Sequence, residues 1–278
     1  MKLIQEAKWI SNINRLNKIK VNPSKEKLKQ SIIESIKKSS KKDNAVLFSG
    51  GIDSTLIALI LKKLNKQFTC YTIGTKNSKD VEFAKDIAAT LNLKLKVRIL
   101  KLNEIEEYLK QTIKILKDKD PVRLSIATVI TAAIDLAKQD NQDNLFSGLG
   151  AEELFIGYKK YKISKTPIKD CWEGLKTTWK RDISRDIAIA KRLNVNLNTP
   201  LLQNEVIIQA MAFPLDKKLS KDQDKIILRE IALDLGIPRE FAYRKKVAAQ
   251  YGSGFDKAIT KLAKRKGFKT KREYINSL

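Results

Sequence analysis

The chain has 278 residues, of which 42% are apolar, so it is long enough and apolar enough to build a sizeable folded core. It contains no histidine, which excludes Ser-His-Asp and Cys-His catalysis, and its two cysteines, Cys70 and Cys171, are too far apart to form a zinc motif. The formal net charge of +25 fits either lysine-rich faces exposed to solvent, which we favour, or a surface that binds nucleic acid. In both cases the positive surface would attract anionic substrates such as ATP.

The chain shows no sign of a membrane or export segment. It lacks a run of about 18 apolar residues, and the stretch from Met1 to Glu6 lacks the apolar core of a secretory signal. Arginine and aromatic residues, which nucleic-acid sites commonly use, are sparse in the basic runs. We therefore expect a cytoplasmic protein with no membrane contact, for which RNA is an open but not a favoured partner.

Helical and strand patterns alternate through the first half of the chain. A helical lead-in is expected over residues 1–43, with an amphipathic helix from Lys25 to Lys38. Short apolar runs then predict strands at 45–48, 68–73, 95–100 and 144–147, and helices at 55–64, 78–91, 104–116 and 125–138. This alternation predicts a mostly parallel α/β sheet with right-handed crossovers over residues 44–158.

The strand patterns fade after about Lys159. Helices are expected at 182–193, 205–212 and 225–235, and the basic tail from Lys257 is expected to be helical with a break at Gly267. No low-complexity linker separates the two parts. Residues 159–278 are therefore predicted to form a helical half that packs on the sheet.

The first predicted strand leads into a loop, residues 49–54, with the sequence Ser-Gly-Gly-Ile-Asp-Ser. Ligands of open parallel sheets bind beyond the carboxyl ends of the strands. Gly50 and Gly51 let backbone amides approach an anion, and the following helix and the Ser49 and Ser54 hydroxyls add further donors. Phosphate alone would repel Asp53, so its place in the loop suggests a magnesium ion. Considered alone, the loop also fits a tight turn with an aspartate helix cap.

The loop resembles the phosphate loop of the N-type ATP pyrophosphatases, which include asparagine synthetase, NAD synthetase and several tRNA-modifying enzymes. Residues 146–158, Phe-Ser-Gly-Leu-Gly-Ala-Glu-Glu-Leu-Phe-Ile-Gly-Tyr, are similar to a signature of asparagine synthetase synthase domains. Residues 225–229, Pro238, residues 244–246 and residues 252–254 are similar to that family's C-terminal run. The matches come in family order over residues 44–256. The resemblance implies a Rossmann-like fold of the adenine nucleotide alpha-hydrolase type.

The resemblance also implies roles for single residues. ATP and Mg²⁺ would be the cofactors, with the metal on Asp53 and Glu152. The pyrophosphate part of ATP would lie on Ser49, Gly50, Gly51 and Ser54, and the adenine on Leu47, Ile73 and Gly148. Lys246 would neutralise the departing pyrophosphate, and Glu153 and Arg244 complete the implied catalytic set. Lys225 and Arg229 are equally compatible with surface charges on a helix.

The implied activity is that of an AMP-forming carbon–nitrogen ligase, which adenylates a carboxylate for attack by ammonia or an amine. Two positions depart from the family pattern: Leu149 stands between the glycines where the family has an acid, and Gln203 replaces the aspartate of its Pro-Phe-Leu-Asp motif. These departures suggest a different carboxylate or amine. The chain has no room for a glutaminase domain, so we expect free ammonia, an amine, or a separate glutaminase subunit as the nitrogen source.

Two other functions stay open. Adenylation of a tRNA base is favoured by the charge of +25, but the second motif and the lack of a cysteine pair oppose it. A non-catalytic nucleotide- or RNA-binding derivative of the fold is favoured by Leu149 and Gln203. The presence of Asp53, Glu152 and Lys246 opposes that interpretation.

Overall fold

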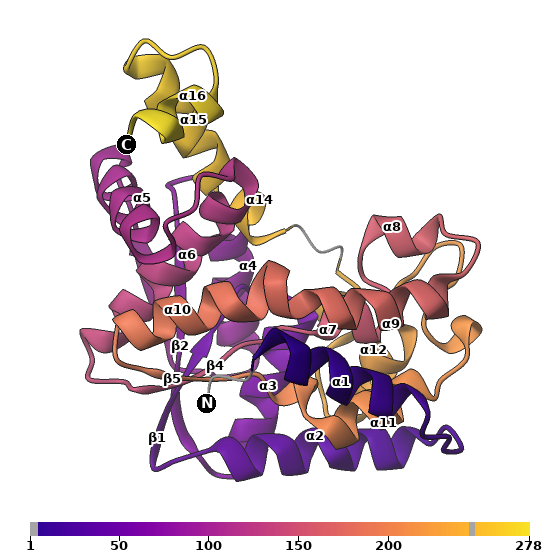
Figure 1. Ribbon diagram of the computed structural model, residues 1–278. Coiled ribbons are helices and arrows are strands. Elements are labelled where there is room, and N and C mark those ends of the chain that lie inside the picture. The colour runs from indigo at the N-terminus through magenta and orange to yellow at the C-terminus, as the bar shows by residue number, and fades with distance from the viewer. Residues whose placement is uncertain (1–4, 245–247) are drawn as a thin grey trace.

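The computed structural model describes residues 5–244 and 248–278, which fold around a five-stranded sheet (Figure 1). The strands are β1 (Asp43–Leu47), β2 (Gln67–Gly74), β3 (Leu95–Ile99), β4 (Asn144–Phe146) and β5 (Asn196–Asn198). Their order in the sheet is β3-β2-β1-β4-β5, and each neighbouring pair is parallel. The predicted α/β class with a parallel sheet is confirmed.

Strand β5 corrects the expectation that the chain beyond Lys159 is helical. It has only three residues, and Leu197 is its one buried apolar side chain, so no hydrophobic pattern marks it. Side-chain amides hold it instead: Asn196 and Asn198 each donate to Asn144 Oδ1 of the neighbouring strand, at 2.8 and 2.9 Å. The hydrophobic pattern could not predict this short edge strand, because polar side chains hold it in the sheet.

Helices cover both faces of the sheet because successive strand residues point to opposite sides. Val46 and Cys70 face one apolar core, whereas Ala45 and Tyr71 face the other. The first core contains side chains of α2 (Lys25–Ser39), α3 (Ile52–Lys63) and α4 (Lys79–Thr90). The second contains side chains of α5 (Leu102–Leu116), α6 (Pro121–Lys138), α15 (Phe255–Arg265) and α16 (Lys271–Ser277). The result is a three-layer arrangement with its ligand edge at the carboxyl ends of the strands.

Much of the second half of the chain extends the first core away from the sheet, although Ile189 and Ala190 pack in the second core. Its helices are α7 (Ala151–Leu154), α8 (Lys159–Lys162), α9 (Pro167–Thr178), α10 (Ser184–Arg192), α11 (Asn204–Met211), α12 (Ile226–Asp234), α13 (Arg239–Ala242) and α14 (Ala249–Gly252). A π-helical turn, η1 (Trp179–Ile183), joins α9 and α10 into one long rod (Figure 1). Short 3-10 turns form at η2 (Pro200–Leu202) and η3 (Leu215–Lys217). Among the described residues, no helix combines the length and the apolar character that crossing a membrane requires.

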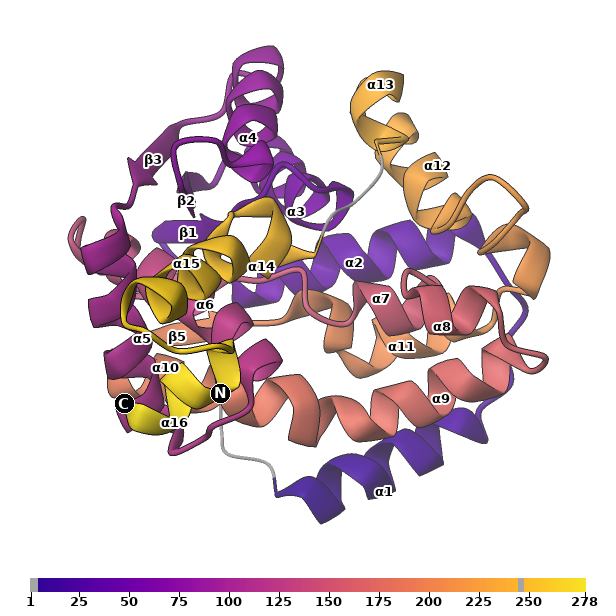
Figure 2. The same ribbon diagram turned by 90° about the horizontal axis from the view of Figure 1, so that it is seen from above.

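The N-terminal helix α1 (Glu6–Asn17) lies against α9, as both views show (Figures 1 and 2). Trp9 Nε1 donates a 2.7 Å hydrogen bond to the Leu175 carbonyl, and Trp9, Ile13 and Leu16 are buried. These contacts join the beginning of the chain to the second half. The predicted lead-in is therefore packed into the first core.

Candidate active site

Two glycine loops meet at the carboxyl ends of the adjacent strands β1 and β4. Gly148, in the loop after β4, touches the loop after β1 so closely that a Cβ atom there would lie 2.8 Å from Asp53 Cβ. The structure thus brings together the two segments that the sequence identifies, although about 95 residues separate them.

The loop after β1 turns tightly before α3 begins. Gly50 has φ +65°, a left-handed conformation that favours glycine, and a Cβ atom there would lie 2.9 Å from the backbone of Phe83 and Ala84. Gly51 is the residue that caps α3, and Asp53 lies in the first turn. The aspartate-cap alternative is therefore wrong. The N-terminus of a helix of 12 residues instead points its amides at this loop, as an anion site requires.

Hydroxyl groups surround this turn. The Ser49 amide donates to Ser54 Oγ at 3.4 Å, and Ser54 Oγ donates to the Gly51 carbonyl at 3.2 Å. Thr55 is buried, and its Oγ1 has no hydrogen-bond partner among the residues that the structure describes. Buried hydroxyls normally have partners, so the orphaned Thr55 oxygen is consistent with a place where a ligand or water completes the bonding.

The centre of the site is a lysine between two carboxylates. Lys225 Nζ donates to both oxygens of Asp53, each at 2.8 Å, and to Glu152 Oε1 at 3.0 Å. The Lys225 side chain is 2% exposed, Asp53 7% and Glu152 15%. The two predicted metal ligands therefore do lie close together, and both accept hydrogen bonds from the Lys225 ammonium. Lys225 is buried, so the surface-charge interpretation of this residue is wrong.

Arg229, one turn further along α12, is buried as well. Its Nε donates to the Asp224 carbonyl at 2.6 Å, and its guanidinium also binds the Asp224 carboxylate and the Ala242 carbonyl. It thereby holds the residue before Lys225 and ties α12 to α13. The interpretation of Arg229 as a solvated charge is also wrong.

Glu153 does not face Lys225. It is 1% exposed and forms an ion pair with Arg181 from the π-helical turn η1, where Asp182 accepts from Arg181 Nε at 2.6 Å. Burial raises the pKa of Glu153 to about 7, despite the opposing charge of Arg181. The structure thus separates Glu153 from the Asp53 cluster and pairs it with a π-helical segment, a feature that often marks functional regions.

Arg244 contacts the loop that follows β1. Its Nη1 donates to the Gly50 carbonyl at 3.1 Å, and its guanidinium carbon lies 3.4 Å from the centre of the Phe83 ring. Burial lowers the pKa of this arginine. The geometry fits a residue that positions the loop. Lys246, the implied pyrophosphate ligand, lies outside the described residues, so its role stays a prediction.

The implied adenine contacts lie at the same edge of the sheet. Leu47 ends β1, Ile73 lies one residue before the end of β2, and Gly148 lies against Asp53. The late Gly-Ser-Gly run packs nearby: the Thr75 amide donates to the Ser253 carbonyl at 2.9 Å. The C-terminal motif therefore reaches the carboxyl end of β2, and the adenine contacts themselves stay a prediction.

The two departures from the family pattern lie in different surroundings. Leu149 is half-buried and packs on the first apolar core, whereas Gln203 is exposed at the start of α11. Leu202, beside Gln203, packs against Gly150, where a Cβ atom would lie 2.4 Å from Leu202 Cδ2. The second glycine loop therefore makes apolar contacts through Leu149 and through the packing of Leu202 on Gly150.

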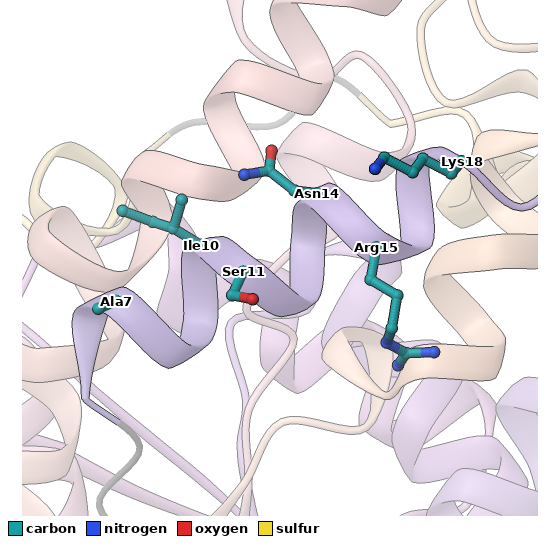
Figure 3. Close-up of a pocket in the computed structure, with 6 residues that line it drawn as sticks. All are labelled: Ala7, Ile10, Ser11, Asn14, Arg15 and Lys18. Atoms are coloured by element: carbon teal, nitrogen blue, oxygen red, sulfur yellow. The ribbon is translucent and has the colours of Figure 1, made fainter.

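A shallow cavity of about 570 Å³ lies elsewhere, along the outer side of α1. Ala7, Ile10, Ser11, Asn14, Arg15 and Lys18 line it (Figure 3). No residue of either glycine loop contributes to it, and it contains no carboxylate. It offers no chemistry comparable to that of the Asp53 cluster.

The carboxylate pair fits a magnesium ion. Mg²⁺ in nucleotide enzymes is commonly held by one or two carboxylates together with substrate phosphates, and does not need a cage of protein ligands. Asp53 and Glu152 meet that requirement, because oxygens of both accept from the Lys225 ammonium beside a helix N-terminus. The described residues contain no cluster of three or more carboxylate, cysteine or histidine ligands.

Comparison with known proteins agrees with these motifs. The family model for asparagine synthase matches residues 26–170 and 169–276. A putative glutamine-hydrolyzing asparagine synthetase of Methanocaldococcus jannaschii is 31% identical over 295 residues, which cover 90% of this chain and 53% of that protein. The glutamine-hydrolyzing asparagine synthetase of Gallus gallus is 27% identical, over 74% of this chain and 39% of its own length. The chain thus spans about half the length of these relatives, or less.

Among solved structures, the NH3-dependent NAD synthetase of Campylobacter jejuni matches with a TM-score of 0.36 and 21% identity. The match covers 61% of this chain and 91% of that one.

Proposed function

The chain belongs to the asparagine synthase family, and we propose that it is a magnesium- and ATP-dependent ligase that adenylates a carboxylate and releases pyrophosphate. The observation that carries the proposal is the convergence of Asp53 and Glu152, from two separate loops, on one cation at the N-terminus of α3. A fold that needed only a tight turn at residues 49–54 would have no use for two converging carboxylates there whose side chains are only 7% and 15% exposed.

The proposed chemistry follows from the fact that a carboxylate has no good leaving group. It is a poor acyl donor because oxide would have to leave. In the proposed reaction a substrate carboxylate oxygen attacks the α-phosphorus, the bond to the β-phosphate breaks, and pyrophosphate leaves with its electron pair. Ammonia or an amine then attacks the acyl carbon and loses a proton, and AMP leaves.

The residues of the chain act by positioning and charge screening, which suits a site without histidine. The amides at the start of α3 and the Ser49 and Ser54 hydroxyls would bind phosphate oxygens. Asp53 and Glu152 would hold Mg²⁺, which when bound supplies positive charge to the phosphates. Lys246 would add charge at the leaving pyrophosphate.

The leucine at position 149, where the family has an acid, supports a substrate other than that of ordinary asparagine formation. Leu149 packs on the apolar core and can neither accept a proton nor bind an ammonium ion. We therefore propose a different carboxylate or amine, with nitrogen from free ammonia, from an amine, or from a separate glutaminase subunit. We place the reaction in the cytoplasm, in keeping with two buried free cysteines.

The test is the fate of α-labelled ATP with magnesium, ammonium and a panel of carboxylates. We expect AMP and pyrophosphate with at least one acid, and a loss of about a hundredfold or more in Asp53→Asn because the metal loses a charged ligand. Asp143→Asn is the matched control, since its side chain is 65% exposed. ATP binding without AMP formation for any acid would contradict the proposal.

Adenylation of a tRNA base is the second candidate, favoured by the net charge of +25. The same assay decides between the two when tRNA replaces the carboxylates. AMP formation that depends on tRNA and falls steeply with salt would identify it. Failure with both substrates, with ATP still bound, would favour a non-catalytic nucleotide-binding protein.

A further inference from the structure

The C-terminal helices α15 and α16 form a basic hairpin at the top of Figure 1, at the opposite end of the molecule from α2. Residues 255–278 hold eight lysine and arginine residues and two acidic residues. Lys266 pairs with Glu106 at 3.8 Å, and Lys271 pairs with Asp256. The other six cations are exposed and form no ion pair with any residue that the structure describes: Lys257, Lys261, Lys264, Arg265, Lys269 and Arg272. We call these six side chains the basic ridge.

Helical spacing puts the first three of them in a row on α15. Lys257, Lys261 and Lys264 are four and three residues apart, so they lie on successive turns of one face. They span about 10 Å along the helix axis, which is the axial rise of about three nucleotides in one strand. The opposite face of α15 is buried, with Phe255 and Ile259 in the second apolar core. The row of cations is therefore held toward solvent.

The hairpin is fixed to the rest of the protein. The ion pair of Lys271 with Asp256 joins α16 to α15. Lys119 Nζ donates to the Ile275 carbonyl at 3.0 Å, which ties α16 to the segment between α5 and α6. A partner therefore meets a backbone that is already in place, which reduces the entropy lost on binding.

The ridge begins beside the candidate active site. The Ser253 carbonyl, just before α15, accepts from the Thr75 amide at the carboxyl end of β2. Tyr251 belongs to α14, which packs on α15, and it is 56% exposed. Sites for single-stranded nucleic acid combine basic side chains with aromatic rings on which bases stack. Both features occur at this end of the hairpin.

The hairpin lacks the apolar surface that a protein or membrane partner would use. Residues 255–278 include no exposed large apolar side chain, and Phe268 and Leu278 pack on the second core. Protein interfaces have an apolar centre, and a helix that lies in a membrane surface inserts its apolar face, which is buried here. A phosphate backbone needs neither, because charge and counter-ion release drive its binding.

We propose that the basic ridge binds the phosphate backbone of a nucleic acid, independently of sequence, and holds the bound strand beside the carboxyl edge of the sheet. Lysine ammonium groups act on phosphates as point charges, so binding follows charge density and does not depend on base identity. The inference goes beyond the proposed ligase reaction and does not depend on it.

A triple variant, Lys257→Gln with Lys261→Gln and Lys264→Gln, tests the ridge, since glutamine retains helix propensity and removes the charge. Fluorescence anisotropy follows a labelled uridine homopolymer of about 20 nucleotides at about 50 mM salt without ATP. We expect the affinity to fall at least about tenfold, and the slope of log K against log salt to become less steep by about two. Arginine at the same three positions should restore both.

The matched control removes three lysines from another basic segment, residues 18–42, which holds nine lysines and two acidic residues. Lys27→Gln, Lys38→Gln and Lys42→Gln change three exposed positions at the opposite end of the molecule. We expect this variant to lose less than about twofold in affinity, because long-range charge is screened. Equal losses in the two triple variants, or no binding to the original protein, would overturn the inference.

Competitors identify the partner. Duplex DNA that displaces the labelled RNA, through the same three lysines, would support the shared backbone chemistry and name a second source of it. Polyglutamate or phosphatidylserine vesicles that compete as well as unlabelled RNA at equal charge would overturn the assignment to nucleic acid. Because ATP is absent throughout, failure here leaves the ligase proposal to its own assay.

Discussion

At the scale of single residues, Lys218 is a buried charge in an apolar setting. It is 0% exposed, and its Nζ lies 3.5 Å from Met211 Sδ. No carboxylate in the described part of the chain forms an ion pair with it, and burial lowers its pKa to about 8 from the ordinary 10.5. That difference corresponds to about 3 kcal/mol of destabilisation when the amine must be protonated. Lys218 differs in this from Lys225, which is as buried but fully partnered.

We expect Lys218→Met to raise the free energy of unfolding by about 1–3 kcal/mol near pH 7, because the variant buries no charge. The stability of the original protein should rise between about pH 8 and 10.5, where the unfolded chain still holds the Lys218 proton and the folded chain has released it. Urea unfolding at pH 7 and at pH 10 measures both effects. Lys217→Met, at the exposed neighbouring position, is the control, and equal pH dependence in the two variants would contradict the assignment.

At the scale of elements, the site depends on close contact between the two glycine loops. Gly148 has ordinary backbone geometry, so what a side chain would disturb there is the 2.8 Å approach to Asp53 Cβ. The neighbouring amide of Ser54 would lie 3.5 Å from the same Cβ atom. Any side chain at this position must push Asp53 and the start of α3 away from β4.

Gly148→Ala should therefore weaken the affinity for nucleotide strongly, and should lower the free energy of unfolding only moderately. We expect a loss of about 1–3 kcal/mol in the free energy of unfolding from overpacking, together with a large rise in the dissociation constant for Mg-ATP. Calorimetric titration and urea unfolding measure the two. Gly236→Ala is the comparison, since φ +98° makes it costly while no atom lies within 4 Å of the added Cβ. It should lose stability and retain ATP affinity; the same pattern in Gly148→Ala would refute the loop contact.

Much of this element-scale arrangement could be predicted from local sequence. Asp53 follows a buried strand and a glycine pair, and Glu152 follows a similar strand and loop, so parallel pairing brings them to one edge. The helix expected at 78–91 also begins as predicted, because Ser78 caps α4 and its Oγ accepts from the Val81 amide at 3.2 Å. These features depend on neighbours in the chain.

Lys225 could not be predicted in the same way. In sequence it is one of many lysines ahead of an amphipathic helix, and its partner Asp53 is 172 residues away. Its burial comes from a left-handed backbone turn and from the space above Gly157, neither of which has a local pattern. Strand β5 escaped detection for a related reason, because asparagine side chains on β4 and β5 hold it more than apolar burial does.

At the scale of the whole molecule, chain segments far apart in sequence close around the carboxyl edge of the sheet. The run from Gly252 to Gly254 returns to β2, where Ser78 Oγ donates to the Gly252 carbonyl at 2.9 Å, and Arg244 reaches back to Gly50. Figure 2 shows α12 beside α3, and the C-terminal helices α15 and α16 on the opposite side of the view, next to α5 and α6. A net charge of +25 draws anions in general toward this assembly.

The most direct test of the account follows an oxygen atom. A stimulating carboxylate labelled with ¹⁸O in its carboxyl group should transfer one labelled oxygen to AMP, because the acyl–phosphate bond forms at that oxygen and breaks on its carbonyl side. Mass spectrometry of the AMP measures the transfer, which Asp53→Asn should abolish together with turnover. Unlabelled AMP, with the label kept entirely in the acid or its product, would contradict carboxylate adenylation by this protein.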